Sequence, residues 1–290
     1  LVVIAWALAM TIFRSPAMSL LGRYAFNTQL PQAASILTLV GGVAGAMGPL
    51  AGNVILSWGP LVAFVVGSAV LLLAALALQL TKPNEAIADE GEQSDVTNAE
   101  PTGLSWQCLG LVFGAGVGVT FGFRTLMMLF SSVLNGQVVN ANAGLILGCI
   151  FVSLALTAIP SGALAARLGN RRAMILGLSG LTLVCVLVSV VQVSSFAIAL
   201  ALSFGAAFSL VSNGTIPFAL SMVPMPKAGL GTGIFFSGGA AASSLFSGVV
   251  QQLQALPLGM VAIAGVVGFL LAGICISSAP RRMAIVTSQG

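Results

Sequence analysis

The feature that most constrains this chain is a series of apolar runs, each about 20 residues long, that follow one another along the sequence. A run of that length, wound into an α-helix, crosses the roughly 30 Å hydrocarbon core of a bilayer. Because lipid offers the backbone no hydrogen bonds, such a chain is expected to fold as a bundle of helices. The runs are residues 1–20, 33–56, 61–80, 104–134, 143–166, 173–192, 196–223, 229–253 and 257–278. We therefore predict an all-α membrane protein with about nine transmembrane helices.

Charged residues are rare and unevenly placed. Of the 290 residues 58% are hydrophobic and 6% are charged, and there is no histidine, whereas a soluble domain has roughly 25% charged residues. The acids are confined to one stretch, at Glu85, Asp89, Glu90, Glu92, Asp95 and Glu100. The apolar runs therefore hold no paired carboxylates, metal cluster or nucleophile with a base, and no phosphate-binding loop occurs. We expect no enzyme, no cofactor, no metal and no nucleic-acid partner.

The acidic stretch lies in the one long polar connection, residues 81–103. Its low apolar content and its prolines near both ends, Pro83 and Pro101, are typical of a solvated linker. It would divide the chain into residues 1–80 with three helices and residues 104–279 with six, and a tail at 280–290 follows.

Basic residues in the short connections indicate the orientation, because such residues favour the cytoplasmic side. If the runs alternate in direction, one side carries Arg23, Lys82, Arg167, Arg171, Arg172, Lys227, Arg281 and Arg282. The opposite connections carry no Lys or Arg. We predict that the linker and the C-terminus are cytoplasmic. Leu1 would then lie at the outer face, so we expect an N-terminally truncated chain that lacks three further helices.

A weak internal repeat agrees with that count. Pro16 followed by Gly41-Gly42 mirrors Pro217 followed by Gly238-Gly239, so residues 1–80 resemble residues 196–278. Parallel repeats of six helices are known from secondary transporters, whose solute site lies at the repeat interface near the midplane. The chain would hold half of a first repeat and all of a second.

The stretch Ser161-Gly-Ala-Leu-Ala-Ala-Arg167-Leu-Gly169-Asn-Arg171-Arg172 resembles the cytoplasmic loop signature of the major facilitator superfamily. In that reading Gly162 permits close helix approach and Gly169 turns the chain. Arg167, Arg171 and Arg172 would bind helix C-termini or lipid phosphates. The family commonly has an acid where this chain has Ala166, so no charge relay is expected here.

A second resemblance involves residues 1–20, which contain Arg14-Ser15-Pro16, together with Ala33-Ala34-Ser35 and Gly41-Gly42. They resemble the fourth and fifth helices of bacterial glycoside-pentoside-hexuronide and sucrose-type cation symporters. The resemblance implies a sugar moved with a coupling cation across a bacterial inner (plasma) membrane. In those relatives an acid commonly ends the fourth helix, where this chain has Gly22 and Arg23.

Two basic residues, Arg14 and Arg124, lie well inside apolar runs, where a charge costs at least ~2.5 to 3.5 kcal/mol. We expect both to face the interior and to contact the solute, together with Asn53 and Asn213. The alternative is structural: the arginines would pair with a carboxylate, a helix carbonyl or a bound anion, and the asparagines would join helices. The glycines before Arg124, at Gly114, Gly116, Gly118 and Gly122, indicate tight packing or a bend beside a cavity.

These patterns predict a partial major facilitator fold, with about nine of twelve helices. The predicted function is secondary active transport of a small polar organic solute by alternating access, by a monomer in the lipid bilayer. Two alternatives remain open. One is an exporter or exchanger of an anionic solute, and the other is a non-transporting scaffold or assembly factor with the same fold.

Overall fold

A computed structural model describes residues 30–80, 105–136, 142–224 and 227–280. These ranges hold eight α-helices and no strand. The helices are α2 (Leu30–Ser57), α3 (Pro60–Leu80), α5 (Trp106–Gly136), α6 (Ala143–Leu168), α7 (Asn170–Val188), α8 (Ser194–Ser221), α9 (Ala228–Gln254) and α10 (Leu258–Ser278). All eight are long and apolar enough to cross a membrane. The predicted all-α membrane fold is thus confirmed. The run at 1–20, the linker at 81–103 and residues 281–290 lie outside the described residues.

The helix ends agree with the apolar runs to within a few residues, and α7 differs most. It spans Asn170–Val188, whereas the run is at 173–192. Gly169, with φ of +86°, ends α6 and lets α7 begin at once. The Asn170 side chain donates a hydrogen bond of 2.9 Å to the Gly214 carbonyl on α8. This tertiary contact holds three polar residues, Asn170 to Arg172, inside a helix that hydropathy alone would start later.

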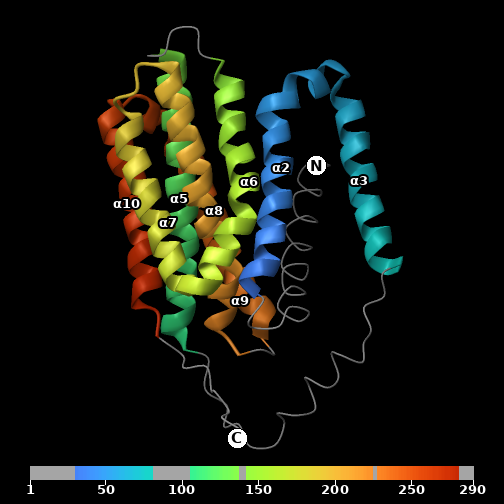
Figure 1. Ribbon diagram of the computed structural model, residues 1–290, viewed down its shortest axis with the longest axis vertical. Coiled ribbons are helices and arrows are strands. Elements are labelled where there is room, and N and C mark those ends of the chain that lie inside the picture. Colours follow the sequence, from blue (N-terminus) through green and yellow to red (C-terminus); the bar gives the residue numbers. More distant parts are fainter. Residues whose placement is uncertain (1–29, 81–104, 137–141, 225–226, 281–290) are drawn as a thin grey trace, which may run out of the picture.

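The helices stand side by side as an upright bundle (Figure 1). In it α2 packs against α6 and α8, α6 against α8, and α5 against α9 and α10, while α7 packs against α8 and α10. Among the described helices α3 has its largest contact with α2, at a few positions only. None of the side chains in Pro60–Ala77 is buried.

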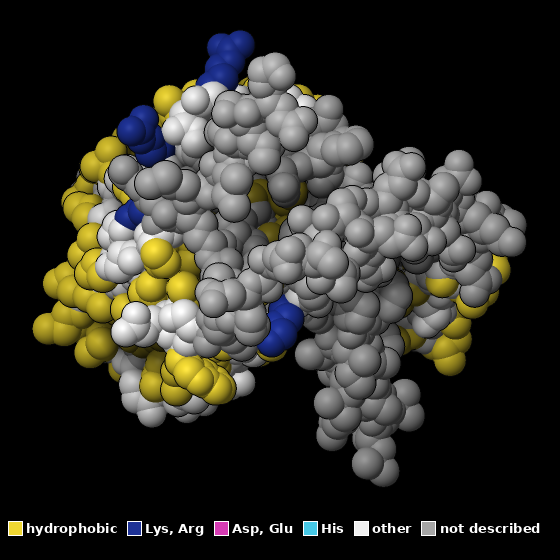
Figure 2. Space-filling model, turned by 90° about the horizontal axis from the view of Figure 1, so that it is seen from below, with side chains coloured by type: hydrophobic (Ala, Val, Ile, Leu, Met, Phe, Trp, Pro, Cys, Tyr) yellow, Lys and Arg dark blue, Asp and Glu magenta, His cyan; other side chains and the backbone are white. Residues whose placement is uncertain are grey.

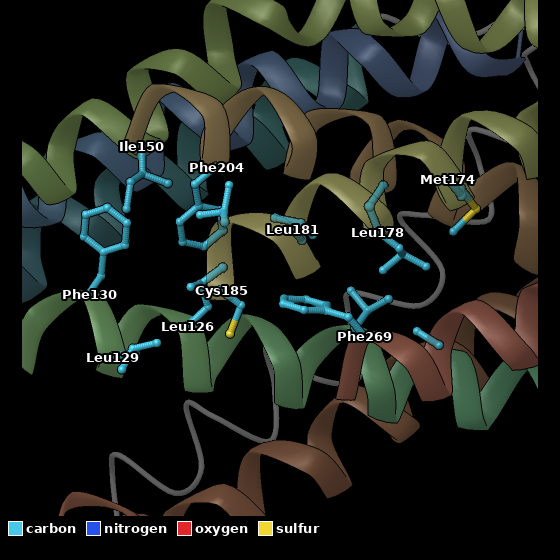
Figure 3. Close-up of a cluster of buried hydrophobic side chains, with 14 of the residues drawn as sticks. Leu126, Leu129, Phe130, Ile150, Met174, Leu178, Leu181, Cys185, Phe204 and Phe269 are labelled. Atoms are coloured by element: carbon cyan, nitrogen blue, oxygen red, sulfur yellow. The ribbon is translucent and has the colours of Figure 1, made fainter. Parts of the chain in front are cut away.

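The core of the bundle lies between α5, α6, α7, α8 and α10. Phe130, Phe204 and Phe269 are its largest fully buried side chains, and Figure 3 shows them with Ile150 and Leu181. The outer surface is apolar as well, since Leu156 is 74% exposed and Ile263 is 63% exposed. A surface of this kind suits lipid, so close packing rather than exclusion of water must hold the helices together.

Glycines let helix α5 approach α9 and α10 closely. A Cβ atom added at Gly118 would lie 2.5 Å from the Gly268 carbonyl oxygen and 2.6 Å from the Ala272 nitrogen, both on α10. One added at Gly116 would collide with the Phe235 carbonyl on α9. α5 remains one continuous helix through this region. These glycines therefore serve close helix packing and do not bend α5 beside a cavity.

Candidate functional site

Arg124 lies near the middle of α5. It follows Trp106 by 18 residues, which is roughly 27 Å along a helix that is roughly 46 Å long. Its side chain is exposed, and it forms no hydrogen bond or ion pair with any part of the chain that the structure describes. The helices around it therefore leave this guanidinium open at mid-span.

Residues near Arg124 on α5 contact three helices, α10, α8 and α9. Gly122 faces α10, where an added Cβ would lie 2.6 Å from the Phe269 ring. Phe123 packs on α8. Arg124 is two residues beyond Gly122, and at 100° per residue its side chain leaves the helix almost opposite to α10. On that side Thr120 precedes Arg124 by one helical turn, and a Cβ added at Gly239 on α9 would lie 2.8 Å from the Thr120 hydroxyl oxygen. Arg124 is nevertheless exposed, so its side chain emerges beyond this contact with α9.

The charge of Arg124 has no counterpart in the helices. Every Asp and Glu of the sequence lies between residues 85 and 100, so no described helix supplies a carboxylate side chain. A cation at this depth is costly unless it faces water, a polar cavity or an anion. Arg124 is thus free to bind a group that does not belong to the described helices.

Asn213 on α8 has a different environment. It is fully buried, and its Nδ2 donates a hydrogen bond of 2.8 Å to the Ala158 carbonyl on α6. Its Oδ1 is buried and lacks a partner among the described residues. This is the interhelical bond weighed as the alternative role, and among the described residues Asn213 and Arg124 form no hydrogen bond with each other.

Two further predicted site residues cannot be placed. Arg14 lies outside the described residues. Asn53 belongs to α2, but its side chain is also outside the described part. Their solute contacts stay predictions.

The glycines of the predicted loop motif have clear structural roles. Gly162 on α6 is buried against α2, and an added Cβ would lie 2.6 Å from the Ser35 Cβ and 3.1 Å from the Pro31 carbonyl oxygen. Gly169 turns the chain with its positive φ of 86°.

The arginines of the motif lie at one end of the bundle. Arg171 donates a hydrogen bond of 3.0 Å to the carbonyl of Ala279, the C-cap of α10. A cation thus lies at the C-terminal end of a helix, where it interacts favourably with the helix dipole. Arg167 and Arg172 are exposed, and Figure 2 shows Lys and Arg side chains on the face at this end. The connections α6–α7 and α8–α9 both lie there (Figure 1).

The contact between α2 and α6 runs nearly the whole length of both helices. From one end to the other it includes Gly162 facing Ser35, Gly42 facing Ala155, Gly45 facing Phe151, Gly148 facing Leu50 and Gly144 facing Pro49. Their described side chains form no hydrogen bond from one helix to the other. The described side chains of the two helices therefore meet through small residues and apolar surface.

Sequence reasoning missed an aromatic pair beside Arg124. The rings of Phe123 on α5 and Phe208 on α8 are stacked, with centroids 4.4 Å apart and planes at 30°. The position of Phe123 next to Arg124 was a signal, but nothing in the sequence pairs it with a residue 85 positions away. Only the packing of α5 on α8 brings the two rings together.

The profile of the Major Facilitator Superfamily matches residues 1–247 of the chain. The chain belongs to the Major Facilitator Superfamily. This family of membrane transporters accounts for the eight long apolar helices in the described part of the chain. No curated protein is significantly similar to the chain. The superfamily member is thus an integral, multi-pass membrane protein of a transporter family.

Proposed function

We propose that this transporter moves a small polar organic solute by alternating access, and that the solute contacts Arg124. The observation that carries the proposal is an exposed guanidinium at mid-span with no carboxylate in any described helix. A guanidinium presents five N–H donors in a planar fork, which suits hydroxyl groups, carboxylates and phosphates. A residue of this kind inside a membrane normally marks the path of a solute.

The contact between α2 and α6 supports alternating access. The two helices come from different sides of the predicted linker, and so from different predicted repeats. A contact of glycines and apolar side chains, without hydrogen bonds across it, can shift by small steps at low cost. Transporters of repeat architecture rock one repeat against the other around a fixed site. α2 and α6 would form part of the surface on which that motion occurs.

Two classes of solute fit this proposal. The resemblance of residues 1–42 to sugar symporters favours a sugar moved with a cation. The unpaired charge of Arg124 favours a second candidate, an exporter or exchanger of an organic anion, because an anion would neutralise the guanidinium while it is bound. The basic end of the bundle, with Arg167 and Arg172, is taken as cytoplasmic in either case.

The test is uptake by the full-length protein in liposomes. Labelled sugars and labelled organic anions are offered with and without a proton or sodium gradient, and with and without unlabelled solute inside. Saturable accumulation driven by a gradient supports symport, whereas uptake that requires internal solute supports exchange. Absence of saturable flux with every solute would contradict the proposal and favour the scaffold alternative.

A further inference from the structure

An aromatic cluster lies at the contact of α5 with α8. Phe204 is fully buried, and its ring centroid lies 5.6 Å from that of Phe123 and 6.3 Å from that of Phe208. Phe123 and Phe208, which are stacked on each other at 4.4 Å, are only partly buried. The cluster thus has an inner part anchored in the core and an outer edge that remains accessible.

The outer edge continues as a strip along α8. Phe208, Ser212 and Thr215 are spaced by four and three residues, so they share one side of the helix. All three are partly buried. The Thr215 hydroxyl donates to the Val211 carbonyl at 3.0 Å, whereas the Ser212 hydroxyl has no partner among the described residues. The strip therefore offers an aromatic face, one free donor and further acceptors.

Arg124 lies beside this strip. It follows Phe123 directly on α5, and the two side chains leave the helix about 100° apart. Phe123 points to α8 because its ring stacks on Phe208. Arg124 follows Thr120, which contacts Gly239 on α9, by one helical turn, so its exposed side chain emerges next to the stack on the side of α5 that faces α9. A cation and a flat apolar surface are thus adjacent at mid-span.

We propose that the solute is an organic anion that carries a flat apolar group. Its carboxylate would accept hydrogen bonds from the Arg124 guanidinium, its flat group would pack on the Phe123–Phe208 stack, and Ser212 would donate to a further oxygen. This inference rests on the proposed function, since it names the class of solute for the same site. It makes Phe208 a residue that determines specificity.

A site for a small inorganic or aliphatic anion would need Arg124 but not the aromatic pair. A neutral aromatic solute would need the pair but not the charge. The proposal requires both, so a set of three probes separates the possibilities: benzoate has a charge and a ring, acetate has the charge alone, and benzyl alcohol has the ring alone.

The experiment is equilibrium dialysis of labelled benzoate against the purified full-length protein in detergent, with protein-free micelles as the blank. Unlabelled acetate and benzyl alcohol serve as competitors. We expect benzoate to bind about tenfold tighter than either competitor, because each lacks one of the two contacts. Arg124→Gln should weaken benzoate binding by about tenfold or more, to the level of benzyl alcohol.

Phe208→Leu is the decisive variant because it retains an apolar side chain and removes the ring. It should weaken benzoate binding by about tenfold, to the level of acetate. Phe246→Leu is the matched control, since Phe246 forms an edge-to-face pair with Phe121 at 6.1 Å in the contact of α5 with α9. The control should retain the affinity of the unaltered protein.

Three results would overturn the inference: benzoate binding no tighter than acetate, benzyl alcohol competing as well as benzoate, or Phe208→Leu leaving benzoate affinity unchanged. Because the binding measurement needs no flux, it tests this inference independently of the proposed transport function. Specific benzoate binding without flux of any solute would contradict transport alone. Flux of a sugar that Arg124→Gln abolishes, with no benzoate binding, would contradict this inference alone.

Discussion

Helix α6 has two long contacts that are built differently. Towards α8 it is held by hydrogen bonds from helix to helix, from the Ser153 hydroxyl to the Leu202 carbonyl at 2.7 Å and from Asn213 to the Ala158 carbonyl at 2.8 Å. Towards α2 its described side chains make no such bond, and glycines bring the two surfaces together. Directional bonds fix one arrangement, whereas small apolar surfaces tolerate several. Under the proposed alternating access, α6 would therefore move with α8 and against α2.

The largest effect is expected from crowding the contact of α6 with α8. A Cβ added at Gly205 would lie 2.7 Å from the Ser153 Cβ and 2.8 Å from the Leu154 backbone nitrogen. Gly205→Leu should therefore separate the helices and lower the free energy of unfolding by about 3 kcal/mol. Thermal unfolding in detergent measures this loss. Gly248→Leu on α9 is the control, since a Cβ there meets nothing within 4 Å; equal unfolding of both variants would refute the claim.

Crowding the contact of α6 with α2 should lower the rate of transport more than it lowers stability. A Cβ at Gly42 would lie 2.8 Å from the Ala155 backbone nitrogen, whereas one at the adjacent Gly41 meets nothing within 4 Å. Gly42→Leu should reduce the rate of solute flux in liposomes about tenfold, because wedged helices favour one state of the cycle. Gly41→Leu should retain flux. Equal flux of Gly42→Leu and Gly41→Leu would contradict the claim that the contact of α2 with α6 moves during transport.

A moderate effect is expected from Asn213→Ala. The variant removes the bond to the Ala158 carbonyl and leaves a small void, but it also removes the unpaired Oδ1. The free energy of unfolding should fall by about 1 kcal/mol, while flux per folded molecule stays near that of the unaltered protein. Loss of flux without loss of stability would instead support the predicted contact between Asn213 and the solute.

The smallest effect is expected from Ser153→Ala. Hydrogen bonds between membrane helices contribute about 0.6 kcal/mol on average, because partners are also found when the helices separate. Loss of the bond from Ser153 to the Leu202 carbonyl should lower the free energy of unfolding by about that amount, as measured by thermal unfolding. A loss larger than that of Asn213→Ala would show that the two bonds are ranked wrongly.

The membrane fold could be predicted because length and apolar content suffice to specify a spanning helix. The start of α7 could not, since Asn170 joins the helix through a bond to the Gly214 carbonyl on α8. Gly162 was recognised as a point of close approach, but its partner Ser35 is separated from it by more than a hundred residues.

The candidate site was predictable only in part. Arg124 could be identified because a charge inside an apolar run is costly and therefore indicates a functional or structural partner. The sequence could not decide between solute contact and helix pairing for Asn213, and its bond to Ala158 now favours pairing. The stack of Phe123 on Phe208 depends on how α5 packs against α8, which no local pattern encodes.

The central claim, that Arg124 contacts the transported solute, is tested most directly by solute flux into liposomes for Arg124→Gln beside Lys227→Gln. Lys227 is the matched control because it is an exposed cation before α9, at the basic end of the bundle. The account predicts at least about tenfold slower flux for Arg124→Gln, as expected when a charged hydrogen bond is lost, with unaltered flux and stability for Lys227→Gln. Equal flux of the two variants would contradict it.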